Sequence, residues 1–152
     1  MSRYELMLFV HVLAAAAWFG AALLALALVE LAARAGDTAG VVWLGEYDDA
    51  LAKFLFIPAA LLTLVAGIAL VLDGPWSFAD DGWVTGGLVL LVGIFALGVG
   101  LILPAGNRLR ALGAAGAPAT ELEPVIGRYR VLSWIDVFLL GLAIFLMTTK
   151  PF

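Results

Sequence analysis

The sequence predicts an all-α polytopic membrane protein, a bundle of four transmembrane helices with both termini outside. Of its 152 residues, 64% are hydrophobic and only 13% are charged, whereas soluble domains average about 45–50% apolar and about 25% charged residues. A membrane-spanning helix uses about 20 apolar residues, and the chain has room for about four such helices with ordinary connections. The alternation of barrel strands is absent, and open sheet edges do not persist in lipid. We therefore expect one integral membrane domain over residues 1–152.

Four apolar runs account for the hydrophobicity, and each is close to the length that crosses the hydrocarbon core of a bilayer. The predicted spans are residues 6–31, 54–72, 84–103 and 131–149.

The connections between these spans differ in character. Residues 41–53 mix Val, Leu, Trp and Tyr with acidic side chains, which is typical of a short interfacial helix. Residues 104–130 are rich in Ala, Gly and Pro and predict a linker. Within that linker, Thr120 and Glu123 form a capping-box pattern, at which we expect the last helix to begin.

The cations predict the orientation, because Lys and Arg in short loops resist translocation while acidic residues contribute little. The second connection contains no Lys or Arg and three Asp residues. Six of the eight cations lie in the first and third connections, which are therefore expected to be cytoplasmic: Arg34, Lys53, Arg108, Arg110, Arg128 and Arg130.

His11 is the only histidine and lies inside the first span. Ionisable side chains in lipid face the bundle interior, where they pair or bind something. One interpretation is a neutral imidazole that is hydrogen-bonded to a backbone carbonyl or a hydroxyl of a neighbouring helix. The other is a ligand site, because Ala15, Trp18 and Ala22 lie within about 40° of His11 around the helix. Such a face leaves a groove for a flat cofactor such as haem, with the imidazole as the axial ligand.

Two methionines extend this hypothesis. Met7 lies one turn before His11, and Met147 is expected at a similar depth in the fourth span. A thioether would complete a His/Met haem iron, and two thioethers with His11 would suit Cu(I). Methionine is also ordinary apolar filler in membrane helices, and we consider that role the more common one.

The third span carries Gly82, Gly86, Gly93 and Gly100 on one stripe, which predicts a close approach by another helix or by a cofactor.

Charged side chains in or near the spans are expected to be paired. Asp136 is expected to pair with Asn107, Arg108 or Arg128. Glu30 and Arg34 have the spacing of a helix-surface ion pair.

Several function classes are excluded. The net charge is −4 and the cations are scattered, which does not suit nucleic acid. The chain has no cysteine, so it has no disulfide, thiolate metal site or cysteine nucleophile. Hydrolase, kinase and dinucleotide-binding motifs are absent.

Four patterns carry a family resemblance: His11-Val12-Leu13, four alanines and Trp18-Phe19-Gly20; Pro58 with Gly67; Pro104-x-x-Asn107-Arg108; and Met147-Thr148-Thr149-Lys150-Pro151. Over nearly the whole chain, they resemble an uncharacterised family of predicted four-span membrane proteins, distantly similar to the CopD copper-resistance domain and to HemJ-type protoporphyrinogen oxidase. The latter similarity implies tetrapyrrole binding by His11 and Lys150. The chain departs from a bis-histidine haem site, because it has no second histidine, and from a copper conduit, because it has few His and Met residues.

The leading hypothesis is an inner-membrane protein that binds haem b or a related tetrapyrrole through His11, with any oxidoreductase activity left open. The cofactor-binding residues would be His11, Ala15, Trp18, Ala22, Met147 and Lys150, with His11 as the metal ligand. The alternatives are copper handling at Met7, His11 and Met147, and a non-catalytic accessory or assembly subunit of a membrane complex. The expected partners are the bilayer and a second copy or a larger complex, in a bacterial plasma membrane.

Overall fold

The computed structural model describes residues 2–151 as an elongated bundle of antiparallel helices. Four continuous helical units are long and apolar enough to cross a membrane: Arg3–Arg34, Thr38–Asp73, Gly82–Ala114 and Ala119–Thr149. These confirm the predicted four-helix membrane bundle. The individual elements are α1 (Arg3–Arg34), α2 (Thr38–Glu46), α3 (Asp48–Leu51), the π-helical segment η1 (Ala52–Phe56), α4 (Ile57–Asp73), α5 (Gly82–Leu97), the π-helical segment η2 (Gly98–Ile102), α6 (Leu103–Ala114) and α7 (Ala119–Thr149).

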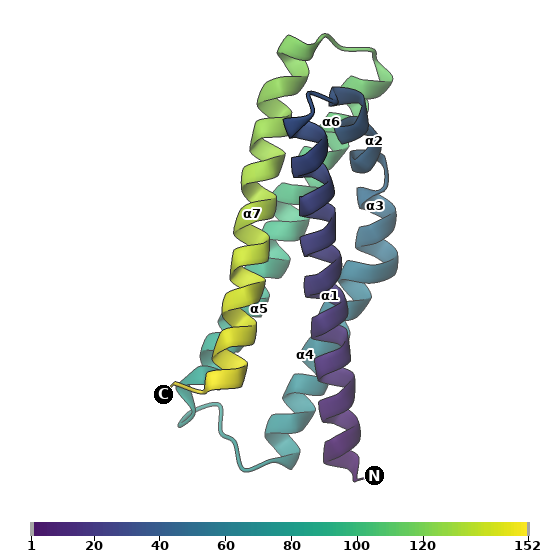
Figure 1. Cartoon of the computed structure of the whole chain (residues 1–152). Helices are drawn as coiled ribbons and strands as arrows, with labels where there is room; N and C mark the ends of the chain where they lie inside the picture. Colours follow the sequence, from purple (N-terminus) through teal and green to yellow (C-terminus); the bar gives the residue numbers. More distant parts are fainter. Residues whose placement is uncertain (1, 152) are drawn as a thin grey trace.

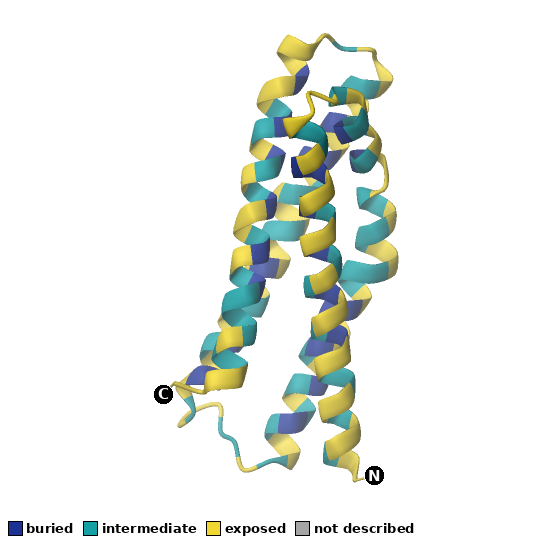
Figure 2. Cartoon of the chain, viewed as in Figure 1, coloured by how far each residue is buried: buried dark blue, intermediate teal, exposed yellow. Residues whose placement is uncertain are grey.

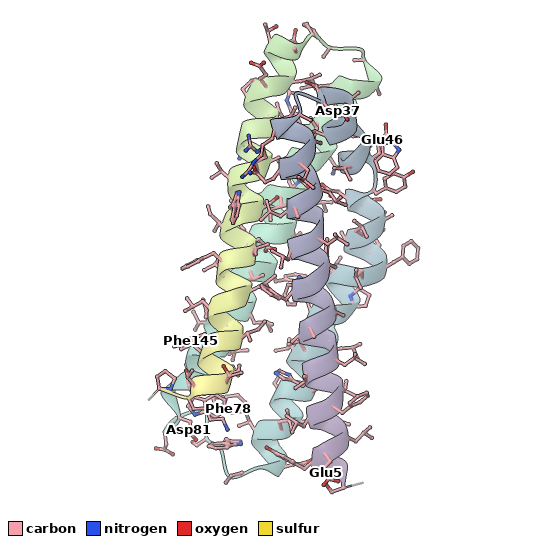
Figure 3. The ribbon with its side chains drawn as sticks, in the orientation of Figure 1. Glu5, Asp37, Glu46, Phe78, Asp81 and Phe145 are labelled. Atoms are coloured by element: carbon pink, nitrogen blue, oxygen red, sulfur yellow. The ribbon has the colours of Figure 1, made fainter. Side chains whose placement is uncertain are left out.

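The two ends of the bundle carry different connections. Figure 1 shows the N-terminus, the C-terminus and the α4–α5 connection at one end, which we call the terminal end. The α1–α2 and α6–α7 connections lie at the other, which we call the basic end. Figure 3 places Glu5 and Asp81 at the terminal end, and Asp37 and Glu46 toward the basic end. Both termini thus lie on one side, and which side faces outward stays a prediction.

Two clusters of buried apolar side chains hold the helices together. One lies in the middle of the bundle and consists of Trp18, Ala22, Leu26, Ala59, Ala60, Ile94, Val137 and Leu140. The other lies at the basic end and consists of Val29, Val41, Ala105, Leu109, Leu122, Ile126 and Tyr129. Large apolar side chains such as Phe54 and Phe138 point outward, and Figure 2 shows exposed residues along the outer faces of the helices. This pattern is expected of a bundle that is solvated by lipid.

The linker predicted for residues 104–130 is largely helical, so that expectation was wrong. Helix α6 continues to Ala114, and α7 begins at Ala119 with Pro118 as its N-cap residue and no side-chain cap. The last helix thus begins next to Thr120, as expected, but without the predicted capping box. Leu109 is completely buried in the basic-end cluster, and this tertiary packing stabilises a helix that the Gly and Pro content disfavours.

One carboxylate at the basic end is held by several donors. Arg130 donates to Glu30 through Nε at 2.8 Å and Nη2 at 2.6 Å, and Trp134 Nε1 donates at 3.1 Å. The predicted Glu30–Arg34 pair is confirmed at 3.8 Å. The sequence did not indicate Arg130 as a partner, because α7 approaches α1 only through the tertiary fold.

Among residues 2–151 the side chain of Asp136 has no hydrogen-bond or ion-pair partner, so the partners expected for it were wrong. Because α6 continues as a helix, Asn107 and Arg108 lie on its exposed face, and Arg128 is also exposed. Asn107 instead accepts a hydrogen bond from Arg110.

Candidate ligand cavity

A cavity of about 450 Å³ lies in the terminal half of the bundle, between the α1–α4 pair and the α5–α7 pair. We call it the terminal cavity. Most of its lining is apolar, with side chains such as Leu64, Leu91 and Ile144, and its polar side chains are few. These include Tyr4, His11, Thr63, Thr148 and Lys150.

His11 is the half-buried centre of this site. Its Nδ1 atom lies 2.8 Å from the backbone carbonyl oxygen of Thr63 on α4. A carbonyl only accepts hydrogen bonds, so Nδ1 carries the proton, and a neutral ring has its lone pair on Nε2. The Cα of Gly67 lies against the ring, because a Cβ there would be 3.0 Å from Cε1 and 3.2 Å from Nδ1. Helix α4 therefore fixes both the tautomer and the position of the imidazole.

Thr63 contributes a second polar group to the same cavity. Its residue exposure is 8%, and its hydroxyl oxygen is buried without a hydrogen-bond partner in the described structure. A threonine in a helix commonly bonds its hydroxyl to the carbonyl of the preceding turn. Here the hydroxyl oxygen is buried without a partner, while other atoms of Thr63 line the cavity.

An aromatic stack lies at the end of the cavity nearest the helix termini. Lys150 ends α7 in a left-handed conformation, with φ of 45°, which turns the chain after the helix. Its Nζ lies 3.8 Å from the ring centroid of Trp76 and 5.0 Å from that of Trp83. The two indole rings meet edge to face at 5.1 Å. This cation–π arrangement covers the terminal cavity on its water-facing side.

The structure brings together most of the residues that the sequence indicated. His11, Ala15, Trp18, Met147 and Lys150 all line the terminal cavity. The methyl group of Met147 lies against Gly87, in the space that a Cβ would occupy.

Two residues fall outside the terminal cavity. Ala22 is buried and instead lines a smaller cavity of about 100 Å³ nearer the basic end, together with Asp48, Tyr129 and Asp136. Met7 lines neither cavity. Met7 nevertheless lies one turn before His11 on the same face of α1, and copper handling by Met7, His11 and Met147 stays a prediction.

The glycine stripe of the third span is only partly used inside the molecule. Gly86 faces Leu146 of α7, where a Cβ would have a contact at 3.5 Å, whereas Gly93 and Gly100 have no side chain or other helix within 4 Å. Those two glycines are exposed. Within the chain, the close approach predicted for the stripe is therefore present at Gly86 but not at Gly93 or Gly100, because η2 and the end of α5 present these two outward. A contact of that face with a second copy or a partner stays a prediction.

Four residues of the site were not singled out for it by the sequence analysis: Thr63, Gly67, Trp76 and Trp83. The pairing of α1 with α4 decides which backbone carbonyl meets His11, and no local pattern encodes that pairing. A signal for the tryptophans did exist, since aromatic side chains gather at membrane interfaces.

No group of three or more His, Cys, Asp or Glu side chains within residues 2–151 is placed to hold a metal ion. A haem iron with one protein ligand does not need such a group.

A family model described as "Predicted integral membrane protein (DUF2269)" matches residues 5–151. No match was found among curated proteins or among solved structures. The similarity to copper-resistance and tetrapyrrole proteins therefore stays a prediction.

Proposed function

The chain belongs to the DUF2269 family of predicted integral membrane proteins, and we propose that this multi-pass protein binds haem b or a related tetrapyrrole in the terminal cavity. His11 is the proposed iron ligand, through Nε2. One observation carries the proposal: Nδ1 donates to the carbonyl of Thr63 at 2.8 Å, a bond that a packing histidine would also make, and in the neutral ring this leaves the lone pair of Nε2 for a metal. Metal-bound histidines characteristically donate their second N–H to a carbonyl or carboxylate, which orients the ring and makes it a better ligand.

The cavity fits a ligand of this kind in size and character. Pockets for cofactors and small molecules have volumes of roughly 300–1,000 Å³ and are mostly apolar with a few polar groups, and the terminal cavity has about 450 Å³. Trp18 and Ala15 share its wall with His11, so a flat ring system would have an aromatic and a methyl group beside it.

Each residue has a distinct role in this proposal. His11 would ligate the metal, the Thr63 carbonyl and Gly67 position the imidazole, and the Lys150 ammonium would attract a carboxylate of the ring. Met147 lines the same cavity and could supply a thioether ligand, since the chain has no other histidine. Bound haem would supply a redox-active iron.

The test is a titration of the purified protein in detergent with hemin. We expect a Soret band that saturates in the wild type and is lost or shifted in His11→Ala. Added imidazole should restore the band in His11→Ala, because free imidazole takes the vacant ligand position. Asp136→Asn is the matched control, since Asp136 lines the smaller cavity, and it should leave the band unchanged.

A companion titration with metal-free protoporphyrin separates iron ligation from ring binding. His11→Ala should bind the metal-free ring about as well as the wild type. A wild-type protein that binds neither compound would overturn the proposed function. A His11→Ala protein with an unaltered hemin spectrum would overturn the role of His11.

A further inference from the structure

One face of α1 packs on α7 at the basic end but is exposed at the terminal end. Glu30 is bonded to α7, and Phe19 lies 3.9 Å from the position of a Cβ on Gly141. Val12 precedes Phe19 by seven residues and Leu8 by eleven, which are close to two and three turns of a helix. Leu8 and Val12 therefore continue the face that contacts α7. They are nevertheless 42% and 55% exposed, and both line the terminal cavity.

The matching face of α7 is also left uncovered. Trp134, Gly141 and Thr148 are spaced by seven residues and so share one face. Trp134 donates a hydrogen bond to Glu30, and Gly141 meets Phe19. Thr148, in contrast, is exposed and donates its hydroxyl to a carbonyl of its own helix.

The register of the two helices places their uncovered faces opposite each other. The helices are antiparallel, and Phe19 lies opposite Gly141. Seven residues toward the terminal end on each helix, the same register sets Val12 opposite Thr148. Figure 1 shows α1 and α7 diverging toward the N- and C-termini. The contact between the two helices thus ends where the terminal cavity begins.

The water-facing side of the cavity is covered instead. Trp83 is 8% exposed, and the Lys150 ammonium lies over Trp76 and Trp83. Phe78 also lines the cavity at this end, as its place in Figure 3 beside the C-terminus illustrates.

We infer that the terminal cavity opens sideways into the bilayer through a slot between α1 and α7, bordered by Leu8, Val12 and Thr148. Its ligand is accordingly a lipid-soluble molecule that enters from the leaflet around the terminal end, not from water. The identity of that ligand as a tetrapyrrole rests on the proposed function, whereas the slot itself does not. An apolar passage of this kind suits lipid, because water gains no hydrogen bonds from its walls.

The slot can be tested without any ligand, because the chain has no native cysteine. Ala15→Cys places a thiol on the cavity wall, and this thiol is labelled with the fluorophore bimane. The labelled protein is reconstituted in nanodiscs whose lipids carry a nitroxide, and quenching of the bimane fluorescence by the nitroxide is measured. Val89→Cys is the lipid-facing reference, at 66% exposure, and Ala22→Cys is the buried reference in the smaller cavity. We expect the label at position 15 to be quenched nearly as strongly as that at position 89, and position 22 to be protected.

Narrowing the slot provides the matched pair of variants. In the Ala15→Cys background, Val12→Phe should remove most of the quenching by lipid, whereas Val89→Phe should leave it unchanged. Should Ala15→Cys fail to fold, Ala143→Cys on α7 reports on the same cavity. Quenching at position 15 by aqueous iodide but not by nitroxide lipid would overturn the inference, as would protection from both.

These outcomes are separable from those of the hemin titration. Lipid quenching at position 15 in a protein that binds no tetrapyrrole would refute the proposed function and retain the slot. A hemin-binding protein whose position 15 is protected from lipid would retain the function and refute the slot.

Discussion

Gly67→Ala tests how the imidazole of His11 is held. A Cβ at position 67 would lie 3.0 Å from Cε1 and 3.2 Å from Nδ1 of His11, which is closer than ordinary van der Waals contact. The ring must move by a few tenths of an ångström, away from the α4 carbonyl at 2.8 Å. A weakened hydrogen bond costs about 0.5–1.5 kcal/mol, and more if the buried donor loses its partner altogether.

The change also has a favourable component, because alanine is a better helix former than glycine by about 0.5–1 kcal/mol. The two effects nearly cancel in the free energy of unfolding, so Gly67→Ala is expected to change stability by less than about 1 kcal/mol. Ligand affinity has no such compensation. Disturbing the group that orients a metal-binding histidine weakens binding by about 10- to 100-fold.

The assay is a hemin titration beside a thermal melt in the same detergent. Gly20→Ala is the matched control, because nothing lies within 4 Å of its Cβ position, and it should melt slightly higher and bind hemin as the wild type does. The reasoning about His11 would be refuted by a Gly67→Ala protein that binds hemin with wild-type affinity.

The remaining predictions concern stability, topology and the outer face of α5. Glu30→Ala should destabilise the bundle by about 2 kcal/mol, since it removes three hydrogen bonds to α7 that average about 0.6 kcal/mol each between membrane helices. Arg34→Ala, whose side chain is 76% exposed, should have little effect in the same denaturation assay, and equal effects would contradict this. Single cysteines at Asp80 and Ala115, both exposed, should react with an impermeant thiol reagent from opposite sides of the membrane, with the former reactive in intact cells; labelling of both in sealed cells would disprove the topology. Gly93→Leu should leave the melting temperature of the monomer unchanged, because no other helix lies within 4 Å; a changed oligomer size in gel filtration would show that a second copy or a partner packs on this face.

The composition of the sequence determined the fold class because the bilayer permits few alternatives. Lipid offers no hydrogen bonds to the backbone, so the N–H and C=O groups of each apolar run must bond within that run. Four such runs of adequate length therefore form helices. The predicted spans therefore lie within the helices that the structure shows. The Glu30–Arg34 pair was predictable for a similar reason, because both residues lie on one helix and its geometry sets their separation.

Contacts between helices required the tertiary structure. The sequence indicated His11, Ala15 and Trp18 as one face of a helix, but which α4 carbonyl meets the imidazole depends on how α1 and α4 pack. The residues after Pro104 were predicted as a linker, because only the basic-end cluster around Leu109 stabilises them as a helix. The partners of Asp136 were predicted wrongly as a consequence, because that helix holds Asn107 and Arg108 on its exposed face. Local sequence patterns determine which side chains share one face of each helix. The packing of four such helices decides which faces meet each other, which enclose a cavity and which are left to lipid, because those contacts join residues far apart in the chain.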